Sequence, residues 1–178
     1  MKKRIIIVLV LIIMVFIYSR YKMSQDNPDV LSPLIEKVEN YIPQRDSIKL
    51  DVSKADVAWQ LDHILKTINR IFEALEKSNP KEYSSSLNAM RIITMTSGYI
   101  PRGRAQSPDI VKPPEVIYTE DIYAQIKEAK ENIIKLKLLD ENSYFKHFVF
   151  GSLNRAQTIR FLEVHTNHHL KIIKDILQ

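Results

Sequence analysis

The residues with the clearest chemical potential are three histidines near the end of the chain, His165, His168 and His169, together with the distant His63. If the last segment is a helix, with about 100° of rotation per residue, His165 and His169 lie one turn apart on one face. That face is the apolar one, so both side chains should point into the protein core. His168 falls at the edge of the same apolar stripe.

Two inward-pointing histidines four residues apart can bind one divalent metal ion, as in zinc-binding helices with an H-x-x-x-H pattern. Burial disfavours charged imidazole, and neutral imidazole is the form that binds metals. The spacing is equally consistent with two core histidines that are satisfied by hydrogen bonds. A third ligand would favour the metal site, and His63 is the candidate.

The position of His63 on its own helix gives this hypothesis less support. Over residues 53–77 the apolar stripe centres near Leu61, Ile68 and Phe72, and His63 lies about 140° from that centre. Either this helix is buried on two sides, or His63 is a surface residue. Periodicity alone favours the surface position.

Other catalytic patterns are not met. Thr166 stands where the metalloprotease pattern H-E-x-x-H requires a glutamate. The sequence shows no P-loop and no candidate Ser-His-Asp arrangement. The chain has no cysteine, which rules out disulfides, thiolate nucleophiles and cysteine-ligated zinc.

The formal charge of +5 does not indicate nucleic-acid binding. Residues 1–22 hold five of the 26 basic residues and no acid, so the remainder has 21 bases against 21 acids. A nucleic-acid-binding domain should instead carry a basic surface on its folded part. We therefore expect no nucleic-acid partner.

Residues 5–18 form an uninterrupted apolar run with basic residues on both sides. The run is shorter than the roughly 20 residues that cross a bilayer as a helix, a length that also suits the core of a signal peptide. The residues that follow do not form the A-x-A-like pattern of a cleavage site, which favours a retained single-pass anchor over residues 1–22 rather than a cleaved signal. Because more bases lie on the N-terminal side, the body of the protein is expected outside the cytoplasm.

The rest of the chain, residues 31–178, is predicted to be one all-α domain, joined to the anchor by a polar linker over residues 23–30. Three glycines and the lack of an alternating apolar pattern argue against a sheet. Four long helices would form a bundle around one core, with a short extra helix at the N-terminal end. The short helix is bounded by Ser32 and Pro43, and the long ones run over residues 53–77, from Asn79-Pro80 to near Gly98, from a Thr119 cap to Leu136, and from a capping box of Asn154 and Gln157 onward.

The connection over residues 98–118 contains four prolines and cannot be one helix. Connections of this length in a compact domain are usually functional or disordered. It can be a lid over a site or a crossover that wraps the bundle. Arg102 and Arg104 within it can meet an anionic substrate or simply face solvent.

A combination of short motifs resembles the DinB/YfiT-like superfamily. Trp59 is followed four residues later by His63-Ile64, and Phe150-Gly151-Ser152-Leu153 leads into a helix with His165 and His168-His169-Leu170. The long connection, over residues 98–108, is also similar to that of a DinB-related branch known as a domain of unknown function. The resemblance covers residues 31–178.

This resemblance implies a four-helix bundle in which three histidines, by position His63, His165 and His169, bind one divalent metal ion such as zinc, nickel or iron. Related members include thiol-dependent transferases and isomerases. The chain departs from the branch at Lys171, where a glutamine tends to follow His-His-Leu, so any oligomer contact of that glutamine is in doubt here. The membrane anchor is a second departure, and it weakens the expectation of thiol transfer.

Two functions are therefore expected. The first is a metal-dependent enzyme that acts on a small-molecule substrate at an open coordination position. The alternative is a non-enzymatic bundle at the membrane, either binding metal or acting through protein contacts. In both cases the membrane is a partner through residues 5–18, and a homodimer is compatible with either function.

Overall fold

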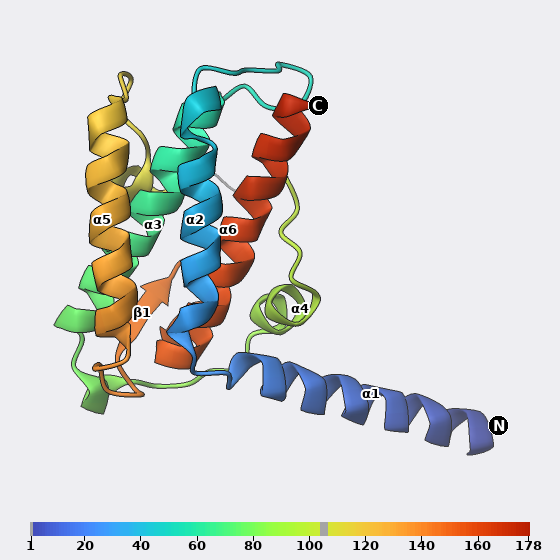
Figure 1. Ribbon diagram of the computed structural model, residues 1–178. Coiled ribbons are helices and arrows are strands. Elements are labelled where there is room, and N and C mark those ends of the chain that lie inside the picture. The colour runs from blue at the N-terminus through green and yellow to red at the C-terminus, as the bar shows by residue number, and fades with distance from the viewer. Residues whose placement is uncertain (1, 104–106) are drawn as a thin grey trace.

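The computed structural model describes residues 2–103 and 107–178, and within them the chain forms six α-helices and one two-stranded sheet (Figure 1). The prediction of a mainly helical chain that begins with an apolar helix is confirmed. The elements are α1 (Lys2–Met23), α2 (Ser32–Asn40), α3 (Val57–Lys77), α4 (Ala89–Ser97), α5 (Thr119–Leu136), β1 (Tyr144–His147), β2 (Gly151–Asn154) and α6 (Arg155–Leu177).

The two helices that carry the histidines have well-formed N-termini. Asp56 caps α3, and its carboxylate accepts a hydrogen bond from the backbone N–H of Trp59 at 2.7 Å. The predicted capping box of α6 is confirmed, since Asn154 and Gln157 each bond to the other's backbone N–H. These caps fix where each helix starts, and therefore which residues face inward.

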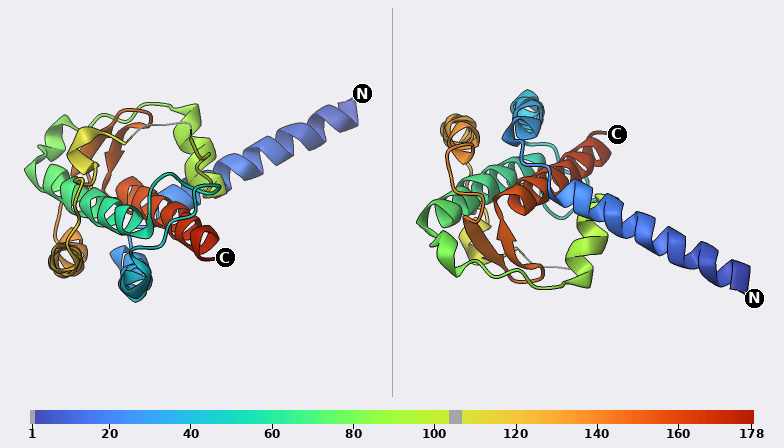
Figure 2. Two further views of the ribbon diagram at one scale, coloured as in Figure 1. Left: turned by 90° about the horizontal axis from the view of Figure 1, so that it is seen from above. Right: turned by 90° about the horizontal axis from the view of Figure 1, so that it is seen from below.

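The helices are arranged in layers (Figure 2). α3 and α6 lie next to each other, with α2 and α5 on one side of them and the β-hairpin, α4 and the long connection on the other. Both α3 and α6 thus bury more than one face. The largest fully buried side chains, drawn from across these elements, are Leu31, Ile35, Leu61, Ile64, Leu65, Ile68, Leu75, Met95, Ile122, Leu136, Leu153 and Ile159.

The predicted third helix is wrong in its first half. After a single 3-10 turn at Pro80–Glu82 the chain is irregular, and α4 begins only at Ala89, where the Asn88 side chain accepts a hydrogen bond from the backbone N–H of Arg91. The serine run over residues 84–86 explains the delay, because serine favours turns and caps over helix interiors. The helix ends as predicted at Gly98, whose φ of 68° is left-handed.

The expectation of no sheet is also wrong. β1 and β2 pair antiparallel, with Tyr144 opposite Asn154 and His147 opposite Gly151. The turn between them is closed by the His147 ring, whose Nδ1 accepts hydrogen bonds from the backbone N–H groups of Val149 and Phe150. Four-residue strands are too short to show alternation, and the only usual turn residue here is Gly151, whose φ is 71°.

Helix α1 stands apart from the body of the protein (Figure 1). Its residues Lys3–Met23 form a helix long and apolar enough to span a membrane, which extends the predicted run of residues 5–18. Within it, Ser19 and Met23 are buried against the rest of the chain, while the apolar side chains before them are exposed. The linker then continues into the short turn Pro28–Leu31, capped by Asn27.

Candidate metal centre

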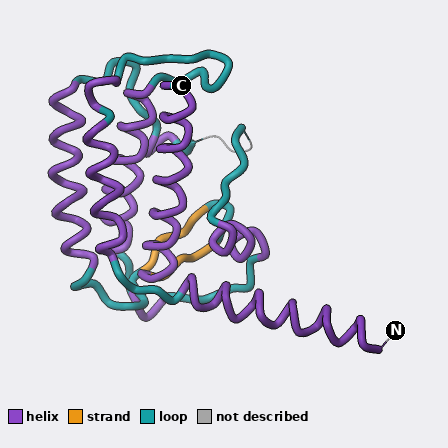
Figure 3. Tube along the Cα trace, turned by 45° about the vertical axis from the view of Figure 1, so that its right-hand side comes forward, coloured by secondary structure: helices purple, strands orange, loops and turns teal. Residues whose placement is uncertain are grey.

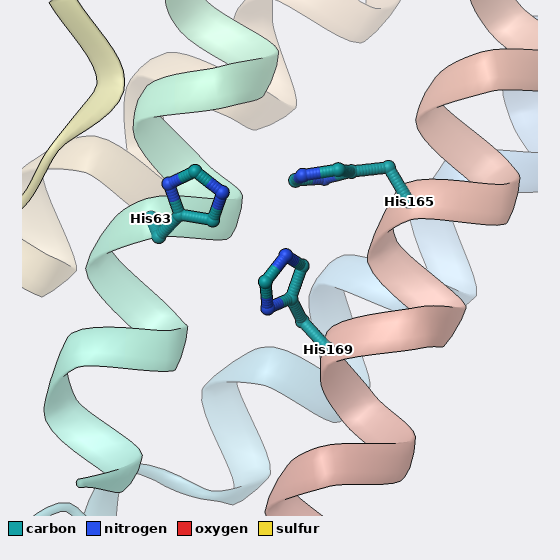
Figure 4. A group of neighbouring side chains, drawn as sticks. All are labelled: His63, His165 and His169. Atoms are coloured by element: carbon teal, nitrogen blue, oxygen red, sulfur yellow. The ribbon is translucent and has the colours of Figure 1, made fainter. Parts of the chain in front are cut away.

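Three histidine side chains converge between α3 and α6 (Figure 4). His63 comes from α3, and His165 and His169 come from successive turns of α6. One ring nitrogen from each lies within 4.8 Å of the others, a spacing that could hold a metal ion. The structure therefore brings together the three histidines that the sequence analysis named as candidate ligands.

His63 is buried, with 3% of its surface exposed, so the surface position favoured by periodicity is wrong. The alternative is correct, because the first half of α3 is buried on two sides, and the eight side chains from Gln60 to Thr67 are all buried except the half-buried Lys66. The indole of Trp59, one turn earlier, stacks on the His63 ring with centroids 4.9 Å apart and planes 23° apart. This stacking sets the plane of the imidazole.

Two of the three imidazoles are oriented by hydrogen bonds from Nδ1. His63 Nδ1 lies 2.8 Å from the backbone oxygen of Val111, in the short turn η4 (Asp109–Val111) of the long connection. His169 Nδ1 lies 2.6 Å from Oε1 of Gln60 on α3. Both oxygens accept, so both Nδ1 atoms carry the proton, and the free lone pair of each ring is on Nε2. Such outer partners are typical of metal-binding histidines.

The third imidazole, His165, differs from the other two. Its Nδ1 atom is buried and has no hydrogen-bond partner among the residues that the structure describes. A buried polar atom without a partner is costly, on the order of 1–3 kcal/mol. A metal ion bound by the three rings, directly at this nitrogen or with water at it, would remove that cost, so the donor set fits the group that the resemblance implies.

The histidines are held in the neutral, ligand-competent form. Burial lowers the pKa of His63, and it lowers the pKa of His165 and His169 well below the ordinary value of 6.5. The mutual proximity of the rings is the second cause for His165 and His169, since charging one ring disfavours charging the next. All three therefore offer lone pairs near pH 7.

His168 and the charged residues nearby do not join the cluster. The His168 ring meets that of His169 edge-on, with centroids 5.0 Å apart. Arg102 forms an ion pair with Asp175 on α6 at 2.6 Å. Arg104 lies outside the described residues.

The two acids closest in sequence to the ligands are engaged elsewhere. Asp62 pairs with Lys66 at 2.7 Å and accepts a hydrogen bond from the Gln125 amide at 2.8 Å. Glu163 pairs with Arg160 at 2.6 Å. Both carboxylates are therefore already paired with a base, and neither is free to act as a general base at the three rings.

Sequence reasoning missed the two groups that orient the rings. Gln60 is a polar residue on a buried face three positions before His63, and that polarity was the available signal. The carbonyl of Val111 had no signal, because every residue carries a backbone oxygen. The long connection thus packs against α3 beside the cluster.

Comparison of the chain with models of protein families, with curated proteins and with solved structures finds no match in any of the three.

Proposed function

We propose that this protein is a membrane-tethered metalloenzyme with a DinB-like four-helix bundle, in which His63, His165 and His169 bind one divalent metal ion. The observation that carries the proposal is the pairing of Nδ1 with a protein acceptor in both His63 and His169. This pairing leaves one lone pair on each of these two rings. One ring nitrogen from each of His63, His165 and His169 lies within 4.8 Å of the others. Core histidines satisfied by hydrogen bonds would not need three free lone pairs in one place.

A bound ion would supply Lewis acidity and a lowered pKa for bound water. The chain's own residues would do the rest. Gln60 and Val111 hold two rings in one tautomer, and Trp59 fixes the His63 plane by stacking. Burial of His63 and His169, beside the half-buried His165, keeps the rings neutral. Zinc, nickel and iron all accept three imidazoles, so the ligand set is compatible with each of them.

A structural metal or interaction module is the second candidate. The ion pairs of Asp62 and Glu163 favour it, because the two acids closest in sequence to the ligands are already paired with bases. In this function the ion would join α3 to α6 and contribute directly to folding.

The tether completes the proposal. The helix Lys3–Met23, with residues 5–18 as its apolar core and bases on both sides of that core, would cross the bilayer, with the body on the extracytoplasmic side. A small-molecule substrate would then reach the cluster from that compartment.

The proposal is tested by measuring how much metal the purified protein contains. The full chain, purified in detergent without a metal-affinity tag, should contain near one equivalent of a divalent metal by elemental mass spectrometry. The His63→Ala/His165→Ala double variant should contain none, while His168→Ala, which alters a neighbouring histidine outside the cluster, should keep it. Metal missing from the wild type, even after reconstitution, would end the proposal.

A second measurement separates the two candidates. An enzyme predicts that His63→Ala folds normally, by circular dichroism, and loses activity in a substrate screen run with the identified ion. A structural metal predicts that the same variant unfolds.

A further inference from the structure

A group of large apolar side chains is exposed on α4 and beside it. Met90 and Ile93 lie three residues apart and so share one face of the helix. Leu87 precedes the helix, and Phe148 forms the tip of the hairpin. Their exposed fractions are 90% for Leu87, 52% for Met90, 61% for Ile93 and 64% for Phe148.

The hairpin tip and α4 form one surface because they are bonded together. The Asn88 side-chain amide donates to the carbonyl of Val149 at 2.9 Å, next to Phe148. The guanidinium of Arg91, on the buried side of α4, donates to the carbonyls of Phe150 and Ser152 at 3.3 and 2.9 Å. These bonds hold the inner side of α4 against the hairpin and turn its apolar side outward.

The same helix packs against α1. Contacts join α4 to α1, and Figures 1 and 3 show it beside the end of α1 that enters the body. The buried Ser19 and Met23 are in this part of α1. The surface is further fixed from α6, where Arg160 Nε donates to the carbonyl of Met95 at 2.9 Å.

We infer that the surface formed by Leu87, Met90, Ile93 and Phe148 lies in the membrane interface beside α1. This inference rests on the proposed tether. The bilayer is the expected partner because α4 packs against α1, whose apolar side chains from Ile5 to Tyr18 are exposed. Tyr18, Arg20 and Tyr21, at the end of α1 nearest the body, would then meet the headgroups.

Four exposed apolar side chains would bind a membrane only weakly if the surface were free in solution. Here α1 holds it at the bilayer, so its insertion is an intramolecular step with a high effective concentration. The helix α4 would then give the body a second membrane contact besides α1, and two contacts restrict how the body is oriented on the membrane.

The absence of cysteine from the chain makes the test direct, since a single introduced cysteine labels one position. The full-length Ile93→Cys variant is labelled with an environment-sensitive fluorophore and placed in vesicles of phosphatidylcholine and phosphatidylglycerol. We expect brominated lipids to quench its emission and aqueous iodide to leave it unchanged. The matched control is Ile134→Cys, an isoleucine that is 65% exposed on α5, the helix on the other side of α3 and α6 from α4 (Figure 2), which should show the reverse pattern.

A third variant, Leu11→Cys, reports on the tether itself. If brominated lipids quench the label at position 11 while iodide quenches that at 93, the interface inference is overturned and the tether stands. If the label at position 11 is open to iodide, the tether fails and the inference falls with it. A label at 93 that is shielded from both quenchers, with unlabelled Ile93→Cys forming disulfide-linked dimers, would assign the surface to a second copy of the chain.

Discussion

The Nδ1 atom of His169 on α6 lies 2.6 Å from the Oε1 atom of Gln60 on α3. The bond crosses between the two helices that hold the candidate centre and fixes the tautomer of one ring. Partners of this kind change metal affinity by about 10- to 100-fold when they are removed. Gln60 is therefore the residue outside the three histidines whose change is most informative.

We predict that Gln60→Leu lowers zinc affinity by about 10- to 100-fold, because His169 loses its acceptor and its orientation. Gln60→Glu should keep or raise the affinity, since a carboxylate accepts the same hydrogen bond. Competition with a chromophoric chelator gives the dissociation constants. The control is Asn69→Leu. Asn69 is also a buried amide on α3, but it bonds to Gln125 and Asn132, so this change should leave the zinc dissociation constant unchanged. Equal affinities for Gln60→Leu and wild type would show that this bond does not tune a metal site.

Metal binding should stabilise the folded chain. At a free zinc concentration about a thousand times the dissociation constant, linkage predicts a gain of about 4 kcal/mol in the free energy of unfolding. Thermal unfolding of the wild type in detergent, with and without zinc, should show the rise in Tm. His165→Ala should show no rise, and a shift of equal size in that variant would place the bound zinc elsewhere.

Acid should destabilise the fold through His147. Burial lowers the pKa of His147 from 6.5 to about 4, so the unfolded chain binds a proton more readily than the folded one. The stabilisation is full above pH 6.5 and is lost as the pH falls from 6.5 through about 4. The three cluster histidines have lowered pKa values and add to the same trend.

The variant His147→Asn separates the contribution of His147 from that of the three cluster histidines. Asparagine can accept the same turn hydrogen bonds without titrating. Denaturant unfolding at a series of pH values should show a slope reduced by at most about 1.4 kcal/mol per pH unit, the value for one proton. An unchanged slope would mean that the other histidines carry the whole effect.

The capping box of α6 should matter for stability because this helix carries two of the three ligands. Asn154→Ala removes the side-chain acceptor for the Gln157 N–H and should lower the free energy of unfolding by about 1 kcal/mol. Asn154→Ser keeps a side-chain acceptor and should retain most of the wild-type free energy of unfolding. Denaturant titration measures both, and equal stability of Asn154→Ala and wild type would contradict the role of the cap.

Sequence periodicity predicted the helical class, the inward face of α6 and its capping box, because those features depend on local spacing. It wrongly put His63 on the surface, because a helical-wheel argument assumes that each helix has one buried face. Helix α3 lies between two layers of the protein and is buried on two sides. The resemblance selected His63 where periodicity did not.

The other features that the sequence did not predict also have physical explanations. The hairpin depends on a histidine ring that closes its turn, and such a bond has no sequence pattern. The late start of α4 reflects Asn88 as a cap after a serine run, a competition between turn and helix that the apolar spacing of Leu87, Met90 and Ile93 concealed. The contact of Val111 with His63 joins residues 48 apart through a backbone oxygen.

The three imidazole rings of the candidate centre are all uncharged ligands, so they cannot neutralise the charge of a bound ion. An ion bound there would keep its full double positive charge, because none of its protein ligands is a carboxylate or thiolate. A buried charge of that size is costly without a counter-ion. The exogenous ligand is therefore expected to be an anion, and the centre would discriminate among small molecules by their charge before their shape.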